Sequence, residues 1–273
     1  DEINAFIPEE YWNLDASFKI AGMKKPLTAR YYGPADSGKE EKAKGAKTVI
    51  RSKAELDAVM KDLENVSYLV DEMKKGERVK KAPIPFTTST MQQEASKHLN
   101  MATQKTMLIA QQLYEGVHVK GEGNVGLVSY IRTDSFRISD EAYEAAVSYI
   151  GENFGEEYVN PERVVYKSKG KTQDAHEAIR PTNVQRTPDS IKESLTKDQY
   201  KLYKLIWERF VASQMSPALY DTMQVKMAAG EYSFRASGSR LTFRGFLEVY
   251  NKGEEEADVQ MPVLKEGDAL KAL

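Results

Sequence analysis

The sequence contains no cysteine and only three histidines. The absence of cysteine excludes disulfide bonds, thiolate zinc sites and cysteine nucleophiles, and it fits a reducing compartment. A bound metal would depend on oxygen ligands or on the scattered histidines. No apolar run is long enough for a signal peptide or a membrane span, so we expect a cytoplasmic protein with no membrane partner.

An excess of positive charge is also missing, since 39 Lys and Arg residues stand against 41 Asp and Glu residues for a net charge of −2. A strong nucleic-acid binder usually carries a basic face, so any polyanion site here must be local. The basic stretches 74–81 and 167–171 are candidates, although solvated charge is the simpler interpretation of each. With 273 residues, of which 41% are apolar, the chain can build two domains with real cores.

The apolar pattern predicts an α+β fold with a discontinuous β domain. Alternation of apolar and polar residues indicates strands over 10–32, 66–73 and 219–250, and a last strand lies in 263–273. A polar loop is expected at 34–47, and a helix capped by Ser52 follows it. Prolines 83 and 85 mark a boundary, because they remove backbone donors and force an extended connection. We therefore predict a β domain of 1–82 and 217–273 around a helical domain of 83–216.

The helical domain is predicted from spacing and capping residues. Two helices are expected within 87–116, broken near Asn100 and ended by Gly116, and the first opens with overlapping capping boxes at Ser89 and Thr90. Further helices follow Ser139 and Thr196. The two helices, a glycine-rich turn and a strand at 127–132 occur in the order of a helix-turn-helix with a β wing, so we predict a winged-helix-like domain.

Tyr130 and Arg132 are the first candidates for chemistry. In a strand they would lie on one surface, about 7 Å apart. A guanidinium can fork onto phosphate oxygens beside a phenol, an arrangement that suits phosphoryl transfer. A strand tyrosine more commonly packs, and Thr133, Asp134 and Ser135 can form a simple turn, so spacing alone leaves both interpretations open.

Two further segments could bind anions. His176 and Arg180 would share a face if "HEAIR" were helical, whereas a zinc-protease motif fails because Arg180 stands where the second histidine is needed. The hydroxyls of Thr88, Ser89 and Thr90 precede a helix, where free amides bind phosphate well. Surface turns and ordinary caps remain the alternatives.

The wording and order of these segments resemble bacterial type IA DNA topoisomerases. The resemblance rests on "PFTTSTMQQEA" with "TMLIAQQLYEG", then "SYIRTDS", then "DAHEAIRPT". The opening "INAFIPEEYW" and the stretch "LYKLIWERFVASQMSPALYD" are also similar to that family, so the likeness spans nearly the whole chain.

The resemblance implies that Tyr130 attacks single-stranded DNA to give a 5′-phosphotyrosine and a free 3′-hydroxyl. Arg132 would hold the scissile phosphate and His176 would orient catalytic groups. Strand passage and religation would then relax negatively supercoiled DNA at the nucleoid. We expect further DNA or phosphate contacts from Thr88, Ser89, Thr90, Thr133, Asp134 and Arg180.

The family also has parts that this sequence does not contain. Its Toprim domain carries a catalytic glutamate, a lysine and the Asp-x-Asp pair that binds Mg²⁺; most of its single-strand-binding domain and its Cys-rich zinc ribbons are likewise missing here. The resemblance thus implies a central fragment, made of a discontinuous antiparallel β arch or hinge domain and the inserted tyrosine-bearing domain. We expect no metal in this fragment, the missing domains as its partners, and no relaxation by the fragment alone.

Two other interpretations compete with this one. Tyrosine recombinases space histidine and arginine as HxxR, whereas His176 and Arg180 are separated by three residues and follow the tyrosine, which argues against that class. The second rival is a winged-helix DNA-binding module without catalytic activity, in which Tyr130 simply packs. It predicts that Tyr130→Phe leaves every DNA-dependent activity intact.

Overall fold

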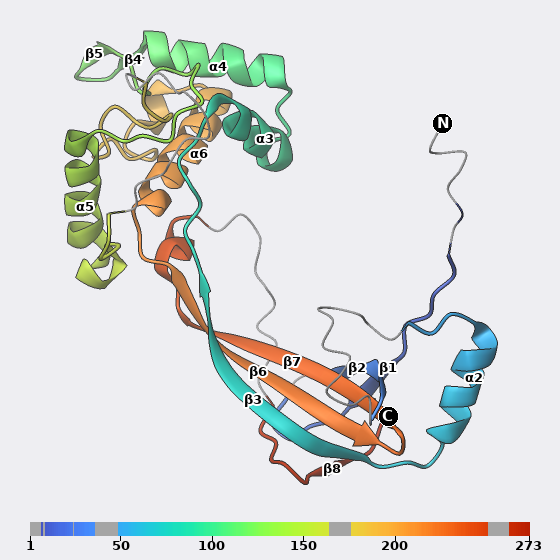
Figure 1. Cartoon of the computed structure of the whole chain (residues 1–273). Helices are drawn as coiled ribbons and strands as arrows, with labels where there is room; N and C mark the ends of the chain where they lie inside the picture. The colour runs from blue at the N-terminus through green and yellow to red at the C-terminus, as the bar shows by residue number, and fades with distance from the viewer. Residues whose placement is uncertain (1–6, 8, 24, 36–48, 164–175, 251–261) are drawn as a thin grey trace. The chain divides into compact units, whose positions relative to one another are not determined.

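A computed structural model describes residues 7, 9–23, 25–35, 49–163, 176–250 and 262–273. The chain divides into two compact units. The first, called the β unit here, comprises 1–78, 220–241 and 256–273, and the second, the helical unit, comprises 79–219 and 242–255. The chain passes from one unit to the other within three of its strands, β3, β6 and β7, all drawn in Figure 1.

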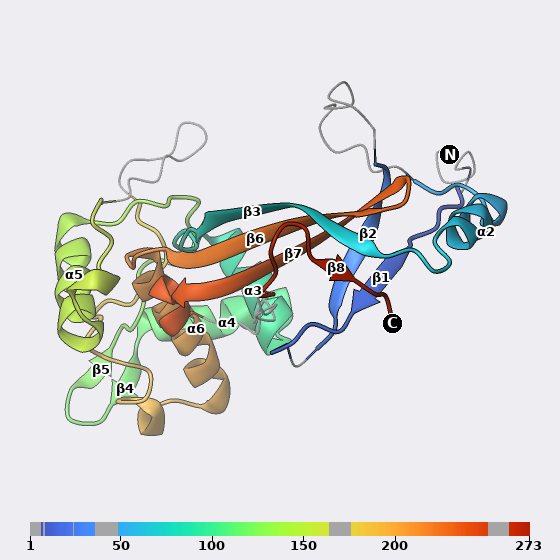
Figure 2. The ribbon, with the colours of Figure 1, turned by 90° about the horizontal axis from the view of Figure 1, so that it is seen from below.

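A six-stranded sheet forms the β unit, in the order β1-β2-β7-β6-β3-β8. The pairs β1–β2, β2–β7 and β3–β8 are antiparallel. The strands are β1 Asp15–Phe18, β2 Leu27–Pro34, β3 Tyr68–Lys80, β6 Ala218–Ala229, β7 Tyr232–Phe243 and β8 Ala269–Leu270. Figures 1 and 2 both show β3, β6 and β7 running side by side as long strands. The chain therefore combines helices with an antiparallel sheet, as predicted.

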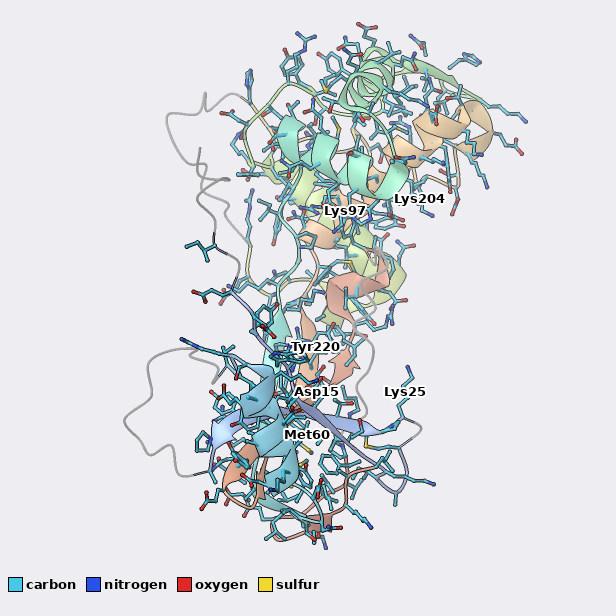
Figure 3. All side chains as sticks on the ribbon, turned by 90° about the vertical axis from the view of Figure 1, so that its right-hand side faces the viewer. Asp15, Lys25, Met60, Lys97, Lys204 and Tyr220 are labelled. Carbon is cyan, nitrogen blue, oxygen red and sulfur yellow. The ribbon has the colours of Figure 1, made fainter. Side chains whose placement is uncertain are left out.

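Aromatic rings fill the core of the β unit. Phe18 and Phe234 each meet the ring of Tyr68 edge-on, at centroid distances of 5.0 and 5.1 Å. Alternation along the strands turns these rings to one face of the sheet, where they are removed from water. The helix α2 (Lys53–Asp62) buries Val59 and leaves Met60, labelled in Figure 3, 49% exposed.

The helical unit is built around α6 (Lys197–Ser213), most of whose apolar residues are buried. Its other helices are α3 Thr88–Leu99, α4 Thr103–Glu115 and α5 Asp140–Phe154, and a two-stranded hairpin is formed by β4 Val117–Val119 and β5 Gly123–Val125. Trp207 of α6 packs edge-on against Tyr149 of α5 at 5.4 Å. Across the described residues, no helix has the length and apolar character needed to cross a membrane.

Several capping predictions are confirmed. Ser52, Ser139 and Thr196 each accept a hydrogen bond from a backbone N–H of the first turn, and Thr196 forms a capping box with Gln199. Asn100 separates α3 from α4 with a left-handed backbone, and Gly116 ends α4. Capping depends on residues that are close together in the sequence, so it can be predicted from the sequence alone.

Two local predictions are wrong, and one conditional geometry is not met. The capping box of α3 joins Thr87 to Thr90, so it begins two residues before the expected start at Ser89. Residues 127–132 form no strand, because no neighbouring strand pairs with them and only Val128 makes an isolated bridge, to Pro181. The helical conformation under which His176 and Arg180 would share a face does not occur: the segment from His176 to Arg180 is extended, and its amides bond to the carbonyl oxygens of Arg137 and Phe86.

The predicted domain ranges also differ from the observed units. Residues 242–250 were assigned to the β domain, but they belong to the helical unit, where Phe246, Leu247 and Tyr250 are buried. Gly245 permits this packing, because a Cβ there would lie 2.3 Å from the carbonyl oxygen of Pro217. The basic stretch 74–81 lies largely on β3 rather than in a loop. The loop predicted at 34–47 falls mostly outside the described residues, and the basic stretch 167–171 falls entirely outside them.

Candidate active site

Tyr130 lies on an extended segment that is held by side-chain hydroxyls and by isolated backbone hydrogen bonds, not by a regular β ladder. Leu127 and Ile131 anchor this segment in the core. Between and beyond these anchors, Tyr130 is 44% exposed and Arg132 is exposed. Nearly half of Tyr130 is thus open to solvent.

One side of the segment is fastened by Thr88, the first residue of α3. Its hydroxyl donates to the carbonyl oxygen of Ile131 at 2.7 Å and accepts the backbone N–H of Thr133 at 2.9 Å. The backbone N–H of Thr88 also donates to the carbonyl oxygen of Thr133, at 2.9 Å. The start of α3 thus fixes the backbone on both sides of Arg132.

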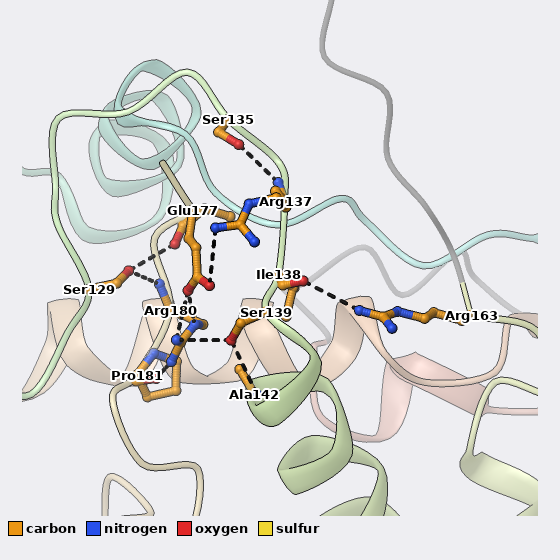
Figure 4. A network of polar contacts seen from close by, with 11 residues as sticks. Ser129, Ser135, Arg137, Ile138, Ser139, Ala142, Arg163, Glu177, Arg180 and Pro181 are labelled. Atoms are coloured by element: carbon orange, nitrogen blue, oxygen red, sulfur yellow. Dashed lines mark hydrogen bonds and ion pairs between the residues drawn. The ribbon is translucent and has the colours of Figure 1, made fainter. Parts of the chain in front are cut away.

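The other side of the segment is fastened by Ser129 (Figure 4). Its hydroxyl donates to the carbonyl oxygen of Ala178 at 2.8 Å and accepts the N–H of Arg180 at 3.0 Å. Its backbone N–H donates to the carbonyl oxygen of Arg180 at 2.9 Å. The residue next to Tyr130 therefore binds the segment that carries His176.

An ion network supports the same segment. The carboxylate of Glu177 lies 2.7 Å from a terminal nitrogen of Arg180 and 3.7 Å from Arg137, as Figure 4 shows. Arg180 also donates to the carbonyl oxygen of Pro181 at 3.1 Å. Because both partners of the closer pair are largely buried, this contact is screened less than a surface ion pair.

Three rings meet at the site. The Tyr130 ring lies 5.6 Å from that of Tyr114 in an edge-on arrangement and 5.7 Å from that of His176 in a tilted one. Tyr114 comes from the last turn of α4 and is 38% exposed. The candidate nucleophile is therefore a neighbour of both a histidine and a second phenol. Tyr130 and His176 are 46 positions apart in the sequence (176 − 130 = 46).

The end of α4 is tied to the residues before Tyr130. The N–H of Leu127 donates to the carbonyl oxygen of Leu113 at 2.7 Å. At Gly126 a Cβ would lie 2.8 Å from the carbonyl oxygen of Tyr114, closer than real Cβ contacts allow. Glycine is therefore required for this close approach, which sets the position of Tyr114 beside Tyr130.

The residues predicted to bind phosphate differ in their exposure to solvent and in their hydrogen bonds. Ser89 and Asp134 are exposed, although the Ser89 hydroxyl shares a hydrogen bond of 3.2 Å with the hydroxyl of Thr87. The polar groups of the others are engaged within the protein: Thr88 as above, Thr90 in the capping box with Thr87, Thr133 with the N–H of Ser135, and Arg180 with Glu177. These four bonds favour a structural role for those side chains, and the roles predicted for all six in DNA binding stay predictions.

Metal ions in proteins are held by clusters of acidic or histidine side chains. In the residues that the structure describes, no group of three or more histidine, aspartate or glutamate side chains is placed to hold a metal ion. The described residues therefore do not form the Mg²⁺ site that the family resemblance implies for the complete enzyme.

Sequence reasoning missed Ser129, Glu177 and Tyr114 as parts of the site. For Ser129, the position next to the candidate nucleophile was a weak signal. Nothing in the spacing indicates the ring contact of Tyr114, because it depends on how α4 returns against the segment 126–130. Glu177 and Arg180 are three positions apart. This spacing predicts an ion pair in a helix but not in an extended segment.

Comparisons with known proteins agree with this arrangement. A family model described as DNA topoisomerase matches residues 1–273. Full-length topoisomerase I from Thermotoga maritima is similar in structure, with a TM-score of 0.77 and 34% sequence identity. The match covers 99% of this chain and 40% of that one, so the chain spans less than half the length of this relative. The chain belongs to the bacterial type IA DNA topoisomerase family.

Proposed function

We propose that this chain supplies the nucleophile of a type IA topoisomerase, and that the nucleophile is the hydroxyl of Tyr130. The observation that carries the proposal is the exposed ring of Tyr130, 5.7 Å from the ring of His176, on a segment fastened by Thr88 and Ser129. All three segments on which the family resemblance rests thus meet around one phenol. Pre-organisation of this kind is what positions a nucleophile for attack.

The reaction is a transesterification on single-stranded DNA. The phenolic oxygen of Tyr130 forms a bond to phosphorus, the bond from phosphorus to the 3′ oxygen breaks, and the phenolic proton leaves while the 3′ oxygen gains one. Arg132 would stabilise the charge that develops on the phosphate, and His176 would orient the reacting groups. The reverse reaction reseals the strand, and strand passage in between changes the linking of the DNA.

The roles of the two units follow from the same family. The β unit would act as the arch or hinge, and α3, α4 and the β4–β5 hairpin would form a winged-helix-like domain around Tyr130. The order of these elements supports the second assignment, because two helices precede a short antiparallel hairpin. That order also favours the alternative function, a DNA-binding module without catalysis.

The chain on its own should not relax supercoiled DNA. It matches 40% of its relative, and the described residues offer no metal site, whereas the family uses Mg²⁺ bound by another domain. A plasmid relaxation assay with the purified chain, across a range of Mg²⁺ concentrations, should leave the topoisomer distribution unchanged. Appreciable relaxation would overturn this expectation.

The nucleophile is tested by trapping the adduct. The full chain is combined with the segments of a complete bacterial topoisomerase that lie outside the match, with Mg²⁺ and a single-stranded oligonucleotide, and is then denatured for peptide mass spectrometry. We expect a 5′-phosphate adduct on Tyr130 that disappears in Tyr130→Phe and persists in Tyr114→Phe. If native gels show assembly on DNA but Tyr130→Phe still cleaves, the binding-module alternative is favoured.

A further inference from the structure

Tyr114 is exposed, although the proposed reaction of Tyr130 gives it no role. Of the tyrosines that the structure describes in the helical unit, only Tyr114 and Tyr130 are exposed, and their rings touch. The others are buried or half-buried. Folding normally removes aromatic surface from water, so two adjoining exposed phenols indicate a surface kept open for a ligand.

The position of Tyr114 is fixed by the backbone. Its carbonyl group lies against Gly126, and the amide of Leu127 bonds to the preceding residue, Leu113. Within the described residues, its hydroxyl makes no hydrogen bond. Backbone contacts therefore set the position of the Tyr114 ring beside Tyr130, and the Tyr114 hydroxyl does not contribute to it.

We propose that Tyr114 forms a stacking site for one base of single-stranded DNA, at a nucleotide next to the phosphate that Tyr130 attacks. The inference rests on the proposed function of Tyr130. The ring centroids are 5.6 Å apart. Successive stacked bases are separated by about 3.4 Å, so a base next to that phosphate lies within reach of the Tyr114 ring. Aromatic side chains bind single strands in this way because every base has a π face.

A different role would also explain the ring contact, namely that Tyr114 only orients the ring of Tyr130. Both roles predict that removing the Tyr114 ring slows cleavage. They differ in whether the effect depends on a base in the DNA. The test therefore combines a protein substitution with the removal of single bases from the oligonucleotide.

The first measurement is the rate of adduct formation in the assembled polypeptide at subsaturating oligonucleotide. We expect Tyr114→Ala to lower this rate by between about fivefold and a hundredfold, the range for one stacked base. Tyr114→Phe keeps the ring and should stay within about twofold of the unaltered chain. Leu108→Ala removes an apolar side chain that is 60% exposed on the same helix and should have no effect.

The second measurement places an abasic nucleotide at each position flanking the cleavage site in turn. At one position the unaltered chain should fall to the rate of Tyr114→Ala, while Tyr114→Ala itself should lose nothing more. If the effects of Tyr114→Ala and of every abasic position simply multiply, Tyr114 acts only on the Tyr130 ring and the stacking site is overturned.

The third measurement does not depend on the chemistry of Tyr130. The full chain carrying Tyr130→Phe is irradiated with an oligonucleotide that contains 5-iodouracil, and we expect a crosslink at Tyr114 that is lost in Tyr114→Leu. Absence of this crosslink at the highest protein concentration would overturn the stacking site. A crosslink without any Tyr130 adduct would instead refute the proposed nucleophile and leave the stacking site standing.

Discussion

At the scale of single residues, the Ser129 hydroxyl reinforces a single β bridge where no regular ladder forms. Residues 127–132 have no neighbouring strand, yet the backbone around Tyr130 must be fixed if its hydroxyl is to meet a phosphate. One hydroxyl supplies an acceptor and a donor to the segment 178–180, and Thr88 does the same for 131–133. Two hydroxyl side chains thus define the geometry on either side of Tyr130.

Replacing Ser129 by alanine should destabilise the helical unit and slow adduct formation at Tyr130. The change leaves the carbonyl oxygen of Ala178 and the N–H of Arg180 without their partner, which costs about 1–3 kcal/mol. Ser129→Thr keeps the hydroxyl and is the matched control. Urea unfolding followed by Trp207 fluorescence, with the adduct assay alongside, measures both effects; equal stability and rate in the alanine variant would refute the fastening role.

At the scale of elements, helices were predictable because their signals are local. Ser139 and Thr196 lie next to the helices they cap, and apolar spacing marks the buried faces. The segment 127–132 was predicted wrongly, because alternation indicates an extended chain but cannot supply a pairing partner. The meeting of Tyr130 with His176 was available only from the family resemblance, since the contact joins segments far apart in sequence.

The helix α6 should make the helical unit sensitive to alkaline pH. Burial raises the pKa of Tyr203, whose hydroxyl donates to the carbonyl oxygen of Arg186 at 2.7 Å. A raised folded-state pKa means that this contribution to stability is complete below the unfolded value of about 10 and is lost as pH rises further. Burial also raises the pKa values of Tyr149 and Tyr250 in the same unit.

The free energy of unfolding of the helical unit should therefore fall between about pH 10 and pH 12. Tyr203→Phe should be less stable at neutral pH, because the hydrogen bond to Arg186 is lost, but its stability should fall less steeply with pH. Denaturant titrations read by Trp207 fluorescence at each pH give both quantities. An identical pH dependence in the two proteins would contradict the assignment to Tyr203.

At the scale of the whole molecule, each unit has a core of its own and one tryptophan. Phe18, Tyr68 and Phe234 lie in the core of the β unit, which also contains Trp12, whereas Trp207 lies in the helical unit. Single-tryptophan variants, Trp12→Phe and Trp207→Phe, can therefore report on the two units separately.

Removal of the Phe234 ring should destabilise the β unit. The ring is fully buried between Tyr31 and Tyr68, so Phe234→Ala costs about 3–5 kcal/mol. We expect the unfolding transition reported by Trp12 to move to lower denaturant while that reported by Trp207 stays in place. Equal shifts of both transitions would show that the two units unfold together.

The burial of Phe246, Leu247 and Tyr250 in the helical unit limits how the gene can be dissected. Tyr250 donates to Glu94 at 2.8 Å, and the N–H of Phe246 donates to the carbonyl oxygen of Ser216 at 2.9 Å. An expressed segment that stops at 219 would leave uncovered the apolar surface that these residues occupy, and it would be prone to aggregate. A soluble tyrosine-bearing domain therefore needs 242–250 rejoined to 79–219 by an artificial linker in place of the long β6–β7 excursion.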